Sequence, residues 1–136
     1  MERKIFALIV LLAVVPLTAW SAEPAGSYLY EQLKNPTYNK TFNALFKGQR
    51  IEPWLKEYLK SRDGVDSPSE MREVGGKTYE FYNVCEPHNC GGSNIYVFFE
   101  SGGAQAWALF TKENEQPRFF GNPDAQMQQV LKDASQ

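Results

Sequence analysis

The chain has 136 residues, of which 43% are hydrophobic and 22% charged, and its formal net charge at pH 7 is −2. This length argues for one domain with a modest core. The slightly negative charge argues against a nucleic-acid partner, because phosphate binding requires a basic face. It is compatible with a basic protein partner attracted by electrostatic steering.

Residues 1–22 have the layout of a secretory signal peptide. Met1–Lys4 is a short basic start, Ile5–Val15 is an unbroken apolar run, and small residues follow it. We expect cleavage after Ser21, with cleavage after Ala22 as the alternative. The apolar run is shorter than the ~20 residues that span a bilayer, so we expect no membrane attachment once the signal peptide is removed.

The mature chain is then residues 23–136, which we expect to form a single domain. It carries 12 basic and 15 acidic side chains, a net charge of about −3, and both cysteines of the chain, Cys85 and Cys90. In an exported protein such a pair indicates a disulfide. In a cytosolic protein the same pair would have suggested metal or redox chemistry.

Apolar residues recur at helical spacing in the first half of the mature chain. The first predicted helix carries Tyr28, Leu29 and Leu33 on one face and is interrupted at Asn35–Pro36. The second carries Phe42, Leu45 and Phe46 and ends near Gly48; the third opens at Pro53 and carries Trp54, Leu55, Tyr58 and Leu59. Residues 61–69 are rich in Asp, Gly, Ser and Pro and are predicted to form a loop.

From Met71 onward the pattern favours strands. Alternating or continuously apolar segments cover residues 77–84, 94–100, 105–112 and 118–120. Glycine pairs at 75–76, 91–92 and 102–103 can supply the positive φ angles of tight hairpins. The predicted fold class is α+β, with an antiparallel meander of about five strands flanked by helices. Because several strands are apolar on both sides, we expect both faces of the sheet to be covered.

The C-terminal segment is predicted to return to helix. Asn122 is the expected cap, Pro123 suits the first turn, and Ala125, Val130 and Leu131 form a weak apolar stripe. The strand aromatics lie at core spacing, and we expect them to pack in the core rather than form a ligand platform; they are Tyr79, Phe81, Tyr96, Phe98, Phe99 and Trp107.

The candidate functional element is the segment Cys85-Glu86-Pro87-His88-Asn89-Cys90, which lies between two predicted strands. A disulfide at the mouth of this hairpin would close a ring worth about 2 kcal/mol in the chain-entropy model. Pro87 fixes its own φ and restricts Glu86. So stiff a ring can present one side chain with little ordering cost on binding, and His88, the only histidine of the chain, is the candidate side chain. The alternative is that His88 is a surface histidine with no specific function.

Catalysis and metal binding by this segment are less well supported than the display of His88. A zinc site at Cys85, His88 and Cys90 needs reduced thiols and a fourth ligand, and a Cys–His nucleophile needs a free thiolate. A thioredoxin-like pair has two intervening residues rather than four. A serine hydrolase could recruit His88, but no Gly-x-Ser-x-Gly motif is present. We therefore expect no catalytic residue, no metal and no cofactor.

These residues resemble the inhibitor of vertebrate lysozyme (Ivy) family of Gram-negative bacteria, whose hallmark is a loop of the form Cys-Lys-Pro-His-Asp-Cys. The resemblance is specific at Cys85, Pro87, His88 and Cys90. It implies a helix-flanked antiparallel sheet, a periplasmic location and often a homodimer. It also implies that the loop enters the active-site cleft of a lysozyme, most simply a C-type lysozyme, with His88 as the plug that protects bacterial peptidoglycan.

Two residues depart from that hallmark, since Glu86 replaces lysine and Asn89 replaces aspartate. The loop charge shifts from about zero to −1, which opposes entry into a cleft that holds carboxylates. The target could therefore be another lysozyme or an endogenous lytic transglycosylase. The runner-up hypothesis is a periplasmic peptidoglycan-binding or protective protein without an inhibitory loop, and an enzyme is the third.

Overall fold

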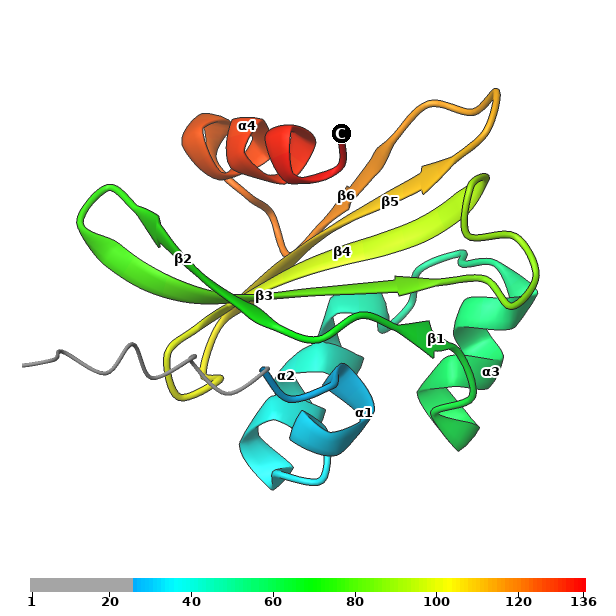
Figure 1. The fold of residues 1–136 in the computed structure, drawn as a ribbon, viewed down its shortest axis with the longest axis horizontal. Helices are drawn as coiled ribbons and strands as arrows, with labels where there is room; N and C mark the ends of the chain where they lie inside the picture. The colour runs from blue at the N-terminus through cyan, green and yellow to red at the C-terminus, as the bar shows by residue number, and fades with distance from the viewer. Residues whose placement is uncertain (1–25) are drawn as a thin grey trace, which may run out of the picture.

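A computed structural model describes residues 26–136, so the predicted signal peptide lies outside the described residues. Within these residues, four helices and six strands follow one another in the order shown in Figure 1. They are α1 (Leu29–Gln32), α2 (Pro36–Phe46), α3 (Pro53–Ser61), β1 (Val65–Asp66), β2 (Glu70–Val74), β3 (Lys77–Cys85), β4 (Ser93–Glu100), β5 (Ala106–Lys112), β6 (Arg118–Phe120) and α4 (Ala125–Ala134).

The six strands form one antiparallel sheet in the order β1-β3-β4-β5-β6, with β2 also paired to β3. β1 lies opposite the C-terminal end of β3 (Val65 to Cys85), whereas β2 lies opposite its N-terminal end (Val74 to Lys77). The two strands therefore make up one interrupted sheet edge. Pro68 stands in the interruption, and it has no backbone N–H to contribute to a ladder.

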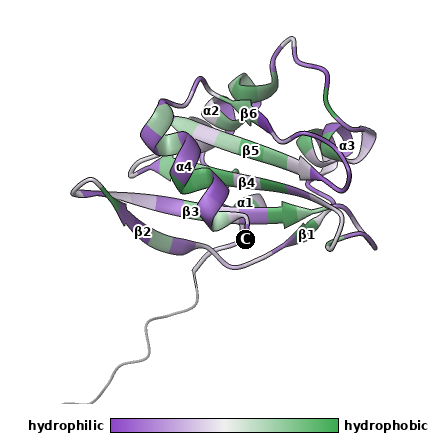
Figure 2. Ribbon diagram, turned by 90° about the horizontal axis from the view of Figure 1, so that it is seen from above, coloured by the Kyte–Doolittle hydropathy of each residue, from purple (hydrophilic) through white to green (hydrophobic). Residues whose placement is uncertain are grey.

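Both faces of the sheet are buried, as predicted from strands that are apolar on both sides. Helices α1, α2 and α3 cover one face and α4 covers the other (Figure 1). The larger core cluster lies under the three helices and includes Phe42, Tyr58 and Phe99, while the smaller one lies under α4 and includes Phe98, Leu109 and Leu131. Figure 2 shows hydrophobic residues concentrated on the central strands β4 and β5. The α+β class and the antiparallel sheet are confirmed.

Three local predictions are wrong for identifiable reasons. Helix α4 is capped by Asp124, whose carboxylate accepts from Met127 N at 2.8 Å; Asn122 and Pro123 precede that cap. Tyr28 caps α1 and is 37% exposed, rather than lying on its buried face. The predicted loop 61–69 contains the two-residue strand β1, which has too little length to show periodicity.

Glycines behave as predicted in two of the three pairs. Gly75, Gly76, Gly102 and Gly103 all have positive φ, but the pair 91–92 does not. In that hairpin the positive φ falls on His88 instead.

No helix within residues 26–136 is both long enough and apolar enough to cross a membrane.

Candidate functional site

The segment between β3 and β4 is closed at its base by a disulfide, as predicted. Cys85 and Cys90 are bonded, and their Cα atoms are 4.9 Å apart. Cys85 is the last residue of β3 and pairs with Asn94, and Glu86 N donates to Ser93 O at 3.0 Å one step beyond. The strand ladder therefore runs to the mouth of the ring, which projects beyond the sheet near α3 (Figure 1).

The four residues inside the ring form a tight turn. Asn89 N donates to Glu86 O at 3.0 Å, Pro87 occupies the second turn position, and His88 occupies the third with φ of 64°. Proline followed by a residue of positive φ is the pattern of a type II turn. The two residues that sequence reasoning singled out as a conformational lock and a displayed side chain thus hold the two central positions of one turn.

His88 occupies a backbone conformation that glycine or asparagine adopts more readily. A non-glycine residue held in the left-handed region costs roughly 1–3 kcal/mol when the surroundings impose it. Arg62, the other large side chain at positive φ, hydrogen-bonds Tyr58 O and Asn39 Oδ1. The side chain of His88 is exposed and makes no hydrogen bond to any residue within 26–136. Its polar atoms are therefore open to a partner.

The two departures from the family loop contact each other. Asn89 Nδ2 donates to Glu86 Oε2 at 2.8 Å across the turn. With lysine and aspartate at these positions, as in the Ivy hallmark, the donor would stand at position 86 and the acceptor at position 89. The double replacement reverses the direction of one cross-turn contact while it preserves a donor–acceptor pair, and it leaves the ring one unit more negative.

Buried polar groups at the start of β4 support the ring from below. Asn94 Nδ2 donates to Cys90 O at 2.8 Å and Asn83 Nδ2 donates to Asn94 Oδ1 at 3.2 Å. Ser93, only 1% exposed, accepts from Trp54 Nε1 at 2.9 Å. Sequence reasoning missed these residues, and it assigned Trp54 only to a helix face. Polar Ser93 and Asn94 at the head of an otherwise apolar strand were the available signal.

A second turn lies beside the ring. Glu113 N, one residue past the end of β5, donates to Gly92 O at 2.7 Å. Lys112 Nζ lies 2.9 Å from Glu115 Oε1 and 3.5 Å from Glu52 Oε2, and its pKa is raised, chiefly by the hydrogen bond from its ammonium to Glu115. The turn between β5 and β6 and the start of α3 are therefore tied to the same end of the sheet as the ring.

The disulfide determines which chemistry this site offers. Cys85 and Cys90 have no thiol to ionise, so the thiolate needed by a Cys–His nucleophile or a zinc site is absent from this state of the protein. Within residues 26–136, no three side chains of His, Cys, Asp and Glu gather as a metal site would require. What the ring offers a partner is one imidazole, one carboxylate and one amide on a constrained backbone.

Comparison with known proteins identifies the family of this chain. The sequence matches the family Inhibitor of vertebrate lysozyme (Ivy) over residues 37–135, which includes the ring. It is 28% identical over 116 residues to the inhibitor of vertebrate lysozyme of Pseudomonas aeruginosa, covering 76% of this chain and 74% of that protein. It is 27% identical over 82 residues to the inhibitor of vertebrate lysozyme of Escherichia coli K12, covering 60% of this chain but only 49% of that protein. The chain belongs to the Ivy family.

Proposed function

We propose that this protein inhibits a lysozyme by inserting the ring Cys85–Cys90 into the active-site cleft of the enzyme, with His88 leading. The observation that carries the proposal is His88 itself, held exposed at positive φ on the tip of a closed turn. The relatives reported above are named as inhibitors of vertebrate lysozyme. We therefore infer a binding protein without catalytic activity of its own.

The chemistry of an imidazole suits the resting state of a lysozyme. Such an enzyme works with one protonated carboxylic acid and one ionised carboxylate. A neutral imidazole has one donor nitrogen and one acceptor nitrogen. His88 can therefore donate to the ionised carboxylate while it accepts from the protonated acid, and it contains no glycosidic bond to cleave.

The stiffness of the ring favours tight binding. Three constraints act on four residues: the disulfide, the fixed φ of Pro87 and the hydrogen bond from Asn89 N to Glu86 O. Ordering a flexible loop on binding costs about 0.5–1.5 kcal/mol for each immobilised side chain. A ring that is already ordered avoids much of this cost, so more of its contact energy becomes affinity.

The charge of Glu86 bears on which enzyme is the target. A carboxylate near the catalytic carboxylates is repelled, and basic residues on the rim of a cleft offset that repulsion. A C-type lysozyme is the first choice because the relatives are named for vertebrate lysozymes. A lytic transglycosylase, which acts on the same glycan with one catalytic acid, would repel Glu86 less, and it is the second enzyme to assay.

We further propose that residues 1–22 direct export to the periplasm and that residues 23–136 are the mature inhibitor, as monomer or homodimer. Purification from the periplasmic fraction, with mass spectrometry of the N-terminus and light scattering of the product, tests these points together. A retained N-terminus at Met1 would contradict the export proposal.

The test of inhibition uses purified residues 23–136 in a cell-wall lysis assay with a vertebrate lysozyme. An inhibitor slows lysis with a stoichiometry set by the enzyme concentration, and reducing the disulfide weakens it. Protection that scales with the amount of cell wall instead would favour the peptidoglycan-binding alternative. Absence of inhibition of both lysozyme and lytic transglycosylases would refute the proposal.

A further inference from the structure

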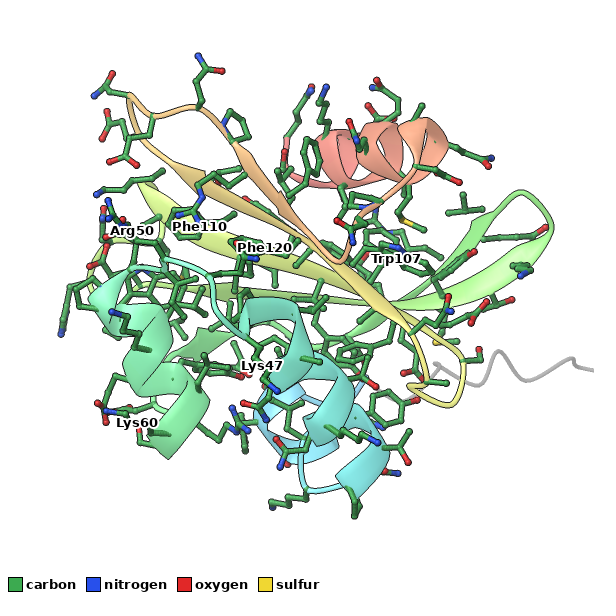
Figure 3. The ribbon with its side chains drawn as sticks, turned by 180° about the vertical axis from the view of Figure 1, so that it is seen from behind. Lys47, Arg50, Lys60, Trp107, Phe110 and Phe120 are labelled. Carbon is green, nitrogen blue, oxygen red and sulfur yellow. A yellow bond between two sulfur atoms is a disulfide. The ribbon has the colours of Figure 1, made fainter. Side chains whose placement is uncertain are left out.

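A surface cleft lies at the far end of the sheet from the disulfide ring. It has a volume of about 390 Å³ and sits between the β2–β3 hairpin, the start of β5 and the N-terminal part of α4. Figure 3 labels Trp107 at this end, beneath α4, and Phe110 of the same strand at the ring end. No part of the proposed inhibitory contact uses this cleft.

The cleft exists because one face of the sheet is covered less completely than the other. Three helices pack on one face, whereas the ten residues of α4 alone cover the second. The sheet residues beyond the reach of α4 are aromatic, so Trp107 is left half-buried there beside the nearly buried Tyr79. The expectation that the strand aromatics pack in the core therefore holds for Tyr79, whereas Trp107 is only partly buried.

The two aromatic rings form a corner. The ring centroids of Tyr79 and Trp107 lie 6.0 Å apart, with an angle of 67° between the ring planes. Trp107 Nε1 makes no hydrogen bond with any residue of 26–136, which leaves an indole donor for a ligand. This pair of rings therefore offers a ligand an apolar ring face and one hydrogen-bond donor.

Polar side chains of several types surround the corner. Lys77, Asn122, Asp124 and Gln126 line the cleft. The amide of Gln126 reaches the β2–β3 turn, since its Nε2 lies 3.3 Å from where a Cβ on Gly75 would be. One oxygen of Asp124 caps α4 by accepting from Met127 N. The two charged side chains of the cleft already have partners, since Lys77 Nζ lies 3.3 Å from Glu100 Oε1 and Asp124 caps α4. The cleft therefore suits a neutral ligand better than an anion or a cation.

We propose that this cleft binds a neutral saccharide ring, such as an N-acetylated pyranose of a glycan chain. A pyranose presents an apolar C–H face that can stack on an aromatic side chain, and a rim of hydroxyl and amide groups that pair with planar Asn, Gln and Asp side chains. The volume is at the lower end of the range of about 300–1,000 Å³ that is usual for small-ligand sites. The cleft therefore accommodates one or two sugar units.

This inference is independent of the inhibitory function. Because the cleft and the ring lie at opposite ends of the sheet, a saccharide in the cleft leaves His88 free. Retention on a glycan chain would raise the local concentration of the inhibitor where glycan-cleaving enzymes act.

Tryptophan fluorescence can test the proposal, because Trp54 and Trp107 are the only tryptophans of residues 23–136. In the Trp54→Phe protein the remaining indole reports on the cleft, and in the Trp107→Phe protein it reports on the base of the ring. Titration with the β-1,4-linked dimer and tetramer of N-acetylglucosamine should give saturable emission changes in the Trp54→Phe protein and none in the Trp107→Phe protein.

Removing a rim contact provides the second readout. Gln126→Ala, made in the Trp54→Phe background, should raise the dissociation constant about threefold or more, while the exposed Gln129→Ala on the same helix should leave it unchanged. Calorimetry with the unsubstituted protein detects binding that fluorescence misses. Absence of saturable heat up to the solubility limit of the tetramer would overturn the proposal, as would a response confined to Trp54. Inhibition of lysozyme by the Trp107→Phe protein should be unchanged, so the two proposals fail separately.

Discussion

Strand β3 begins and ends in hairpin turns. Both turns contain residues with positive φ, but the residue types that adopt it differ. At its start, Gly75 and Gly76 both have positive φ, and glycine adopts this conformation without steric cost. At its end, the positive φ falls on His88, which is stapled between Cys85 and Cys90. The turn at Gly75–Gly76 therefore joins its two strands with little backbone strain.

From this difference we infer that the second turn serves to display a side chain. A glycine at position 88 would meet the conformational demand but would offer a partner nothing beyond its backbone. The disulfide and Pro87 hold His88 in place, and the polar contacts of Ser93, Asn94 and Trp54 support the ring below it.

Replacing the displayed imidazole should have the largest effect. Asn accepts positive φ at low cost, so His88→Asn should keep the turn and leave the free energy of unfolding unchanged or raise it by about 1 kcal/mol. The inhibition constant should rise about tenfold or more, because a central hydrogen-bonded anchor is worth ~2 kcal/mol. Gly76→Asn is the matched control, with φ of 80° and open space around it. If both variants inhibit equally well, His88 is not the anchor.

Opening the ring should come next. The double variant Cys85→Ala/Cys90→Ala should lose about 2 kcal/mol of unfolding free energy in the chain-entropy model. It should also inhibit more weakly, because the freed turn must be ordered on binding. Urea denaturation and a lysis assay measure the two effects. Reductant should weaken the original protein and leave the double variant unaffected; equal inhibition by both proteins would show that the ring need not be closed.

The contact between Glu86 and Asn89 should give a smaller, coupled effect. Asn89→Asp alone places two carboxylates where Asn89 Nδ2 now donates at 2.8 Å, and it should destabilise the ring. Adding Glu86→Lys restores a favourable pair, so the double variant should recover the lost stability. A double-mutant cycle on unfolding free energy should show a coupling of about 0.5–1 kcal/mol. A coupling of zero would mean that the two replacements are unrelated.

The smallest effect concerns Asp66, which lies opposite Val84 near the ring end of β3. Burial raises the pKa of the Asp66 carboxyl above its usual value, although hydrogen bonds from Tyr58 Oη and Tyr30 N lower it. Its Oδ1 is buried without a partner among the described residues. A raised pKa stabilises the fold fully below the unfolded-state pKa, and this contribution is lost as the pH rises through the folded-state pKa.

Asp66→Asn removes this titration. The stability of the variant relative to the original protein should therefore rise between about pH 3 and pH 7. Urea denaturation at both pH values measures the difference, and inhibition at pH 7 should not change. A relative stability that falls with pH would show that the ionised carboxylate is favoured in the fold.

The sequence was sufficient for the helices, for strands β3 to β6 and for the ring, because these depend on local signals. The spacing of Leu55 and Tyr58 predicts a helix face, and a cysteine pair after a signal peptide predicts a disulfide. Long-range contacts could not be predicted in this way. The hydrogen bond from Trp54 to Ser93 joins residues 39 positions apart, and the cleft beside Trp107 depends on how far α4 extends over the sheet.

The positive φ of His88 shows that prediction from local sequence signals can also fail within a single turn. The pattern predicts positive φ at Gly91–Gly92, but the disulfide closes the loop before this pair. Pro87 and His88 therefore occupy the two central positions of the turn. Proline favours the second position of a type II turn, and the positive φ is at the third position.

Cross-saturation NMR on isotope-labelled inhibitor bound to unlabelled vertebrate lysozyme tests insertion of the ring most directly. Irradiating lysozyme protons should reduce the amide signals of His88 and Asn89 most strongly, and should leave those of Gly75 and Gly76 unchanged. Saturation centred on the β2–β3 hairpin, or a complex in which the His88 signal is unaffected, would contradict insertion of the ring.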